Sequence, residues 1–238
     1  MLTTFFRPMA ALMFASVAGC VLLALRSILL GHGRHLHLVW NLFLAWLPLF
    51  FALGLQWWSQ FRSEKRGLGW WGLAGGWLLF FPNAPYILTD LAHLRSRTAP
   101  HYWTDLVLIL VFALTGLVLG FVSLFVVQRL VARRFGWVAG WGLVGATTFL
   151  NGFGVYAGRF LRWNSWDVVF SPWSLLNEGV QWVASMPESP RGLMLPLLFA
   201  VLMFLAYVML YGLTHMRFEE ETPAFGRLEL ERAGGTGA

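Results

Sequence analysis

Apolar residues along this chain gather into six long runs, separated by short stretches where charged residues and glycines accumulate. Each run is close to the roughly 20 residues that an α-helix needs to cross the hydrocarbon core of a bilayer. The runs are evenly apolar and too long for strands, so the pattern predicts an all-α fold, a polytopic membrane helix bundle with six transmembrane helices. The runs are approximately Pro8–Leu30, Leu36–Trp58, Leu68–Leu88, Asp105–Val127, Trp137–Ala157 and Leu193–Tyr211.

A longer and only moderately apolar connection separates the fifth run from the sixth. Its second half predicts a short amphipathic helix from Pro172 to Met186 that lies in the membrane interface. Glu178 and Gln181 would each be costly in hydrocarbon, which disfavours the alternative of a seventh span. We expect residues 1–216 to form a single transmembrane helical domain and residues 217–238 to form a polar, mobile cytoplasmic tail.

The composition favours lipid as the solvent of this chain. Of its 238 residues, 58% are hydrophobic and 12% are charged, with a mean hydropathy of +0.65. A soluble domain carries about 25% charged residues. This chain has too few polar and charged residues to cover a surface that faces water. The net charge of +6 comes from basic residues between the apolar runs, where they meet lipid head groups. The predicted partners are membrane lipids and no nucleic acid; protein partners and cofactors stay unknown.

The positions of lysine and arginine predict the orientation. With a cytoplasmic N-terminus, the cytoplasmic segments hold ten of the 17 basic residues and the opposite segments hold seven. The two dense basic clusters, residues 62–66 and 129–134, then both lie in the cytoplasm, as the positive-inside rule requires. We therefore expect a multi-pass protein with both termini in the cytoplasm.

The third run ends in an unusual polar stretch, FFPNAPYILTDLAHL at residues 80 to 94. Its two prolines lack an N–H and disfavour helix at the residue before each, so we expect the helix to stop or kink near Phe81. The side-chain amide of Asn83 can then bond the freed carbonyls. A short helix is expected to restart after the break, with Thr89 as its N-cap.

On that short helix Asp90 and His93 lie one turn apart and share a face. The break would turn them back over the bundle, whereas a straight helix would carry them away into solvent. An acid near a low-dielectric boundary favours an arginine with fixed donors. We therefore predict that Asp90 faces Arg159 and Arg162, at the end of the fifth helix.

These residues together predict a polar pocket that faces outward. The candidate catalytic residues are Asp90 and His93, as acid or base. The arginines suit bidentate contacts to a phosphate or carboxylate, or else serve as interface anchors or internal ion-pair partners. The candidate binding residues are Asn83, Tyr86, Arg159, Arg162, Asn164 and Asp167.

A metal is the alternative for the acid and the imidazole, since a divalent ion suits both, but Asp167 or His101 would have to complete the site. We favour hydrogen bonding at a wet helix end and expect no metal. The histidines of HGRHLH, residues 32 to 37, are expected in a solvated loop. Three glycines near the end of the fifth run are expected to permit close helix contact rather than bind an anion: Gly152, Gly154 and Gly158.

Two segments, FPNAPYILTDLAHL and GRFLRWNSWD, closely resemble hallmark segments of a bacterial multi-pass membrane family, domain-of-unknown-function family 1361. The resemblance covers most of the chain, from about the second helix to the sixth. It implies a bacterial inner-membrane protein and no particular activity.

Three functions are compatible with the sequence. The pocket could bind or act on a lipid-linked or anionic substrate, as a binding protein or an integral membrane enzyme. The chain could instead be a small-solute transporter, although only scattered polar residues continue toward the inner side. It could also be a structural or accessory subunit, in which the polar groups only hold helices together.

Overall fold

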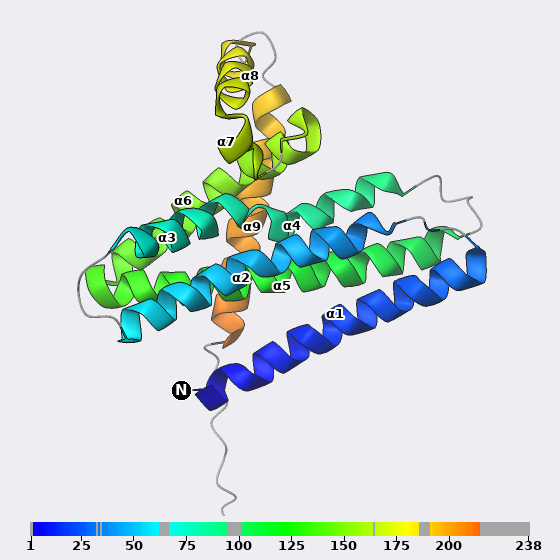
Figure 1. Cartoon of the computed structure of the whole chain (residues 1–238), viewed down its shortest axis with the longest axis horizontal. Helices are drawn as coiled ribbons and strands as arrows, with labels where there is room; N and C mark the ends of the chain where they lie inside the picture. Colours follow the sequence, from blue (N-terminus) through cyan, green and yellow to red (C-terminus); the bar gives the residue numbers. More distant parts are fainter. Residues whose placement is uncertain are drawn as a thin grey trace, which may run out of the picture. The chain divides into compact units, whose positions relative to one another are not determined.

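A computed structural model of the chain shows a succession of helices (Figure 1). It describes residues 2–31, 33, 35–61, 67–94, 101–163, 165–185 and 191–214, without the side chains of residues 2–6, 93, 169, 182–185, 191 and 192. The expected tail, residues 217–238, lies outside these ranges. In chain order the helices are α1 (Leu2–Leu30), α2 (His37–Phe61), α3 (Leu68–Phe80), α4 (Asn83–Tyr86), the 3₁₀-helix η1 (Ile87–His93), α5 (Tyr102–Phe135), α6 (Trp137–Tyr156), the π-helical turn η2 (Ala157–Leu161), α7 (Asp167–Phe170), α8 (Pro172–Ser185) and α9 (Arg191–Thr214).

The described helices confirm the all-α class, and five of them are long and apolar enough to cross a membrane. These five are α1, α2, α5, α6 with η2, and α9. Pro48 lies inside α2 without ending it. The third apolar run differs from the others, because α3 has only 13 residues and is too short to span alone.

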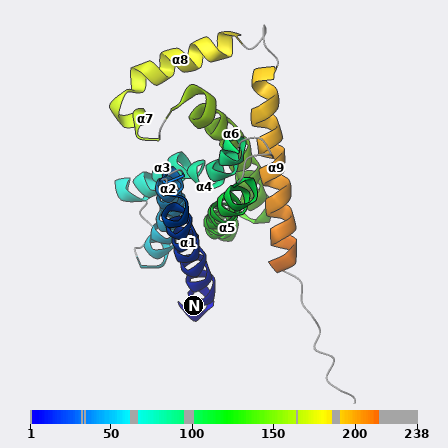
Figure 2. The same cartoon turned by 90° about the vertical axis from the view of Figure 1, so that its right-hand side faces the viewer.

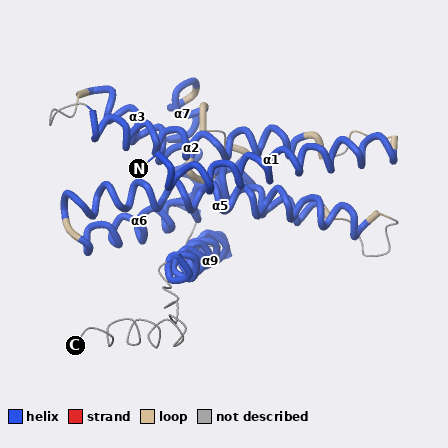
Figure 3. Tube along the Cα trace, turned by 90° about the horizontal axis from the view of Figure 1, so that it is seen from below, coloured by secondary structure: helices blue, strands red, loops and turns tan. Residues whose placement is uncertain are grey.

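The third run lies alongside α2 as three consecutive short helices, α3, α4 and η1. Near the start of α3, Gly69 lies against the ring of Trp58, close to the end of α2. In η1, Asp90 accepts a hydrogen bond from Asn41, in the first turns of α2. This antiparallel contact covers about 25 Å of α2, at a rise of 1.5 Å per residue. Figures 1 and 3 show α1, α2, α3, α5 and α6 running roughly along one direction.

Several helix ends meet at one end of this bundle. Asp105, in the first turn of α5, contacts Arg26 near the end of α1 and His35 just before α2. Arg159, in η2 after α6, contacts Asp90 in η1. We call the end of the bundle formed by these five residues the polar end.

The hydrophobic core lies among α1, α2, the α4–η1 segment and α5. Leu42 and Leu49 of α2 are buried against Ile109 and Phe112 of α5, and Ile87 closes the cluster from η1. Many large apolar side chains on the outer faces of the same helices are exposed, as expected for surfaces that meet lipid.

The predicted amphipathic helix corresponds to α8, which begins at Pro172 as expected. On one face, Glu178 accepts a hydrogen bond from the indole of Trp163. Trp173 and Val180 lie on another face and are exposed. Figures 1 and 2 show α7 and α8 to one side of α1, α2 and α5. The helix has 14 residues, too few to cross a bilayer, and its location in the interface stays a prediction.

The chain divides into two compact units, residues 1–204 and residues 205–238. Of the second unit, the structure describes residues 205–214, the last turns of α9. All residues of the candidate site lie in the first unit. The predicted division at residue 216 stays a prediction.

Candidate functional site

The break in the third run packs against two glycines of α5. A β-carbon added at Gly116 would lie 2.6 Å from the carbonyl oxygen of Ala84, closer than real side chains approach. One turn later, a β-carbon at Gly120 would lie 3.0 Å from the Ala84 side chain. Glycines four residues apart are a common device for close helix approach in membranes. They bring the broken helix directly onto the backbone of α5.

Glycines of α6 receive the other side of the break. Gly154 lies against the ring of Pro82, and Gly158 lies against the ring of Tyr86. Gly152 faces the backbone of α9 at Pro196. The prediction that these three α6–η2 glycines permit close helix contact is confirmed.

Asn83 ties the break to the segment that follows η2. Its Nδ2 donates to the carbonyl of Phe80 at 3.0 Å and to Oγ of Ser165 at 3.0 Å. The Ser165 hydroxyl donates in turn to the carbonyl of Leu79 at 3.2 Å. The predicted bond from Asn83 to a carbonyl freed at the break is therefore confirmed. The same amide also holds residue 165 over the break.

The break interrupts the helix without reversing the chain. α3 ends at Phe80, as predicted, but Phe81 and Pro82 keep right-handed helical backbone angles. The chain therefore continues in the same direction, and the prediction that it turns back is wrong. Asp90 reaches the bundle because η1 lies alongside α2 and α5. Thr89 is not an N-cap, because its hydroxyl donates to the carbonyl of Tyr86, three residues earlier.

Asp90 is the centre of the first polar cluster, and it is only 1% exposed. Its Oδ2 accepts a hydrogen bond from Nδ2 of Asn41 at 3.0 Å. Its Oδ1 lies 3.4 Å from Nη1 of Arg159 and 3.8 Å from Nε2 of His37. The predicted pairing of Asp90 with Arg159 is confirmed. An ionised carboxylate in this position is matched by a cation and an amide donor.

Arg162 does not join this cluster, so the prediction for this residue is wrong. It is exposed and ends η2 in the left-handed conformation, with φ at 59°. The π-helical turn and this left-handed residue remove the α-helical spacing that would have put Arg159 and Arg162 on one face. The His93 side chain and Asn164 lie outside what the structure describes, while Asp167 begins α7.

A second cluster centres on Asp105, next to the first. Nε of Arg26 donates to Oδ1 of Asp105 at 2.8 Å, and Nε2 of His35 lies 3.4 Å from Oδ2. Arg26 and His35 are each 6% exposed, and the rings of His35 and His37 are 5.9 Å apart. Burial lowers the pKa of His35, and Arg26 adds to this, although Asp105 acts in the opposite direction.

The expectation of a solvated histidine loop is wrong for His35. Its backbone is left-handed, with φ at 72°, and the imidazole is buried against Asp105. Histidine is one of the residues that adopt this conformation more readily than most. His32 lies outside the described residues, and His37 is exposed.

Sequence reasoning missed three members of these clusters: Arg26, Asp105 and Asn41. A signal was present for each, because each interrupts or begins an apolar run. Ionisable residues within membrane helices face partners or cavities by default. The sequence contains no indication that Arg26 and Asp105 would meet each other.

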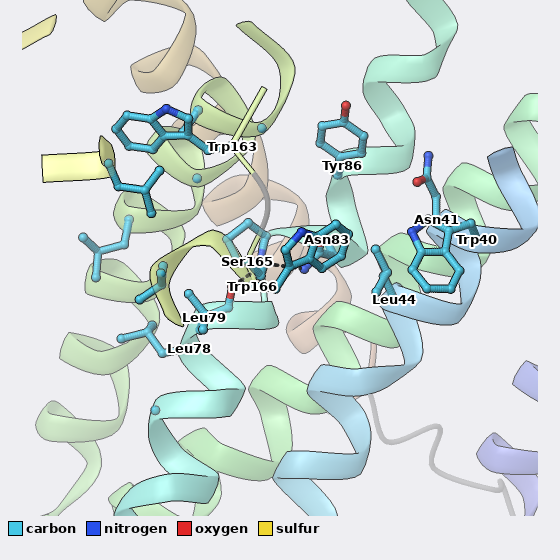
Figure 4. Close-up of a pocket in the computed structure, with 18 residues that line it drawn as sticks. Trp40, Asn41, Leu44, Leu78, Leu79, Asn83, Tyr86, Trp163, Ser165 and Trp166 are labelled. Carbon is cyan, nitrogen blue, oxygen red and sulfur yellow. Dashed lines mark hydrogen bonds between the residues drawn. The ribbon is translucent and has the colours of Figure 1, made fainter. Parts of the chain in front are cut away.

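A chamber of about 700 Å³ lies beside the Asp90 cluster, between α2, the α3–α4 break, the end of α6 and the segment that leads to α8 (Figure 4). Its size is typical of ligand pockets, which measure roughly 300–1,000 Å³. Its described lining residues are Trp40, Asn41, Leu44, Gly75, Leu78, Leu79, Pro82, Asn83, Tyr86, Leu150, Gly154, Ala157, Gly158, Trp163, Ser165, Trp166, Val168 and Leu175.

Of the predicted binding residues, Asn83 and Tyr86 line this chamber. Arg159, Arg162 and Asp167 are not among its described lining residues. Asn41 lines the chamber and also donates to Asp90, so the chamber and the first cluster share one side chain. Among the described residues, no group of three or more His, Cys, Asp and Glu side chains could hold a metal ion.

Residues 40–210 match the sequence model of a family described as protein of unknown function, DUF1361. This chain belongs to the DUF1361 family. The match confirms the predicted family. In this DUF1361 protein the matched residues include Asn41, Asp90 and Arg159. Arg26 and His35 precede the matched residues. No curated protein and no solved structure matches the chain.

Proposed function

We propose that this DUF1361 protein binds an amphipathic membrane lipid in the chamber beside Asp90. The observation that carries the proposal is a large chamber lined mostly by apolar residues, with leucines and tryptophans prominent among them and a few polar groups. Ligand pockets combine these features, the apolar wall for affinity and the polar groups for orientation. Leu78 and Leu150 line the chamber and are also exposed, so its wall continues onto the surface that faces lipid. An apolar chain could enter from the bilayer along these side chains.

The polar part of the ligand would lie near Asn41 and Tyr86. Figure 4 shows these two side chains together on one side of the chamber, away from Leu78 and Leu79. Asp90 holds the amide of Asn41, and Arg159 balances the charge of Asp90. In this proposal the ion pair positions the binding residue. The catalytic role expected for Asp90 and His93 stays a prediction.

We further propose that α3, α4 and η1 together form a sixth membrane crossing. Their antiparallel contact with α2, from Trp58 to Asn41, supports this arrangement. Six crossings would put both termini on one side, which the basic clusters assign to the cytoplasm of a bacterial inner membrane. The chamber would then lie near the outer interface, with α8 along that interface.

A substitution that fills the chamber tests the proposed binding. Gly75 lines the chamber, and a β-carbon there would have no neighbour within 4 Å, so Gly75→Phe projects a ring into open space. Gly72, one turn earlier on α3, is equally unobstructed and is not among the described lining residues, so Gly72→Phe is the matched control. The protein and both variants would be purified in mild detergent, and the lipid retained would be quantified by mass spectrometry.

We expect Gly72→Phe to retain as much lipid as the unsubstituted protein and Gly75→Phe to retain several-fold less, with both variants unfolding at the same temperature. Equal retention by the two variants would reject lipid binding in the chamber.

The proposed topology is tested by thiol labelling of intact cells. In a Cys20→Ser background, which removes the one cysteine, new cysteines would replace His101 and Arg134, both exposed at opposite ends of α5. An impermeant reagent is expected to label position 101 from outside and to leave position 134 unlabelled. The reverse pattern would overturn the orientation.

A further inference from the structure

We propose that the chamber selects a lipid whose head group is uncharged and donates hydrogen bonds, such as the free hydroxyl of a diacylglycerol. This inference rests on the proposed lipid binding and names the ligand class. The chemical groups that face the chamber differ from those expected of a phosphate site. No lysine, arginine or histidine is among the described lining residues, whereas the polar ones include the amides of Asn41 and Asn83 and the phenol of Tyr86.

The amide of Asn41 has a defined orientation. Its Nδ2 donates to Oδ2 of Asp90, and a buried carboxylate paired with Arg159 can only accept. The nitrogen is therefore directed to Asp90 through one of its two hydrogens, and Oδ1 is the acceptor atom of the amide. Asn41 and Tyr86 both line the chamber, and Figure 4 shows their side chains on the same side of it. Asn41 thus offers the ligand an acceptor.

The amide of Asn83 is oriented in the same way. Its Nδ2 donates both to the carbonyl of Phe80 and to Oγ of Ser165, so both of its hydrogens are used. The Ser165 hydrogen is also used, because that hydroxyl donates to the carbonyl of Leu79. Asn83 therefore adds a second acceptor oxygen to the lining. The Tyr86 hydroxyl can both donate and accept.

The arginine closest in sequence to the lining residues is paired with a carboxylate outside the described lining. Arg159 follows the lining residue Gly158, but its guanidinium lies 3.4 Å from Asp90. A phosphate in the chamber would face two amide oxygens and no cationic side chain among the described lining residues, and burying a charge without an opposite charge is costly. A hydroxyl would instead donate to Asn41 or Asn83 and accept from Tyr86. Sites that hydrogen-bond a ligand hydroxyl discriminate strongly against ligands that lack it.

Two fluorescent lipids with identical chains provide the test. One is a diacylglycerol with a fluorophore at the end of one chain, and the other is the corresponding phosphatidic acid, which adds only the phosphate. Each would be titrated with the purified protein in detergent micelles, using the unsubstituted protein, Gly75→Phe and Tyr86→Phe. Tyr86→Phe keeps the ring that lies against Gly158 and removes the hydroxyl.

We expect the diacylglycerol to bind at least about tenfold more tightly than the phosphatidic acid, a difference of about 1.4 kcal/mol. Tyr86→Phe should weaken binding of the diacylglycerol several-fold and leave binding of the phosphatidic acid unchanged. Gly75→Phe should abolish the binding of both lipids. Excess free glycerol should displace neither probe, because it lacks the chains. Displacement by glycerol would exclude a lipid as the ligand.

If the phosphatidic acid binds as tightly as the diacylglycerol or more tightly, and Gly75→Phe abolishes this binding, the proposed preference for an uncharged head group is wrong. The proposed lipid binding in the chamber would still hold. Binding of both probes that is insensitive to Gly75→Phe would overturn lipid binding in the chamber itself. The two failures are therefore distinguishable.

Discussion

Replacing Asp90 by asparagine removes the charge at the centre of the polar end and keeps the shape of the side chain. Asp90 is 1% exposed, accepts from Asn41 at 3.0 Å and lies 3.4 Å from Arg159. A hydrogen bond to a charged group contributes about 1.5–3 kcal/mol to stability. Breaking a fully buried ion pair costs about 3–5 kcal/mol, and an exposed pair contributes about 0–1 kcal/mol.

The Arg159 side chain is 18% exposed, so water partly solvates it and the loss lies below the fully buried range. We expect Asp90→Asn and Arg159→Ala each to lower the free energy of unfolding by about 2–3 kcal/mol. Because both substitutions remove the same ion pair, the loss of unfolding free energy in the double variant should be smaller than the sum of the two single losses, by about 1 kcal/mol or more. Arg162→Ala is the matched control, and an exposed arginine three positions away should change stability by less than about 0.5 kcal/mol.

The assay is unfolding in detergent, followed by a dye that becomes fluorescent on reaction with Cys20, which is only partly exposed in the folded protein. Denaturant unfolding curves of the same samples would convert the differences into free energies. Strict additivity of the Asp90 and Arg159 substitutions would refute the pair. An effect of Arg162→Ala as large as that of Arg159→Ala would refute the geometry of η2.

Two further substitutions test the close packing and the buried histidine. Gly116→Ala should destabilise the protein by about 1–3 kcal/mol, since its β-carbon would lie 2.6 Å from the Ala84 carbonyl oxygen. Gly142→Ala, with no neighbour within 4 Å, should be neutral or slightly stabilising in the same unfolding assay; equal losses would contradict the close approach. His35 has a pKa lowered mainly by burial, so the unfolded chain binds more protons and stability should fall as pH drops below about 6.5. His35→Gln should reduce that decline between about pH 7.5 and 5.5, and an unchanged decline would show that other groups cause it.

Local chemistry explains which features could be predicted from the sequence. The apolar runs predict helices because every backbone group must be satisfied within the membrane. The break at Phe81, the bond from Asn83 to Phe80 and the helix from Pro172 follow from prolines and from neighbours within a few residues. The pairing of Asp90 with Arg159 was predictable from chemical complementarity.

Other features depend on which helix faces are brought together, and a single sequence does not contain that information. Asn41 and Asp90 are 49 positions apart, and Arg26 and Asp105 are 79 positions apart. Nothing near any of them in the chain specifies its partner. The failure to place Arg162 is different, because one left-handed residue after a π-helical turn changes which face a side chain occupies.

The chamber is the clearest example of a feature that only the tertiary structure decides. Its lining comes from α2, α3, α4, α6, η2 and the segment around α7 and α8, and most of these residues are ordinary apolar residues of membrane helices. Their apolar character follows from the membrane environment in any arrangement of the helices. Whether they fill a core or enclose a space depends on how closely the helices approach, and the glycines against Ala84 and Pro82 set that distance here. The sequence determined the helices and the break, whereas the packing of those helices against one another determined the cavity.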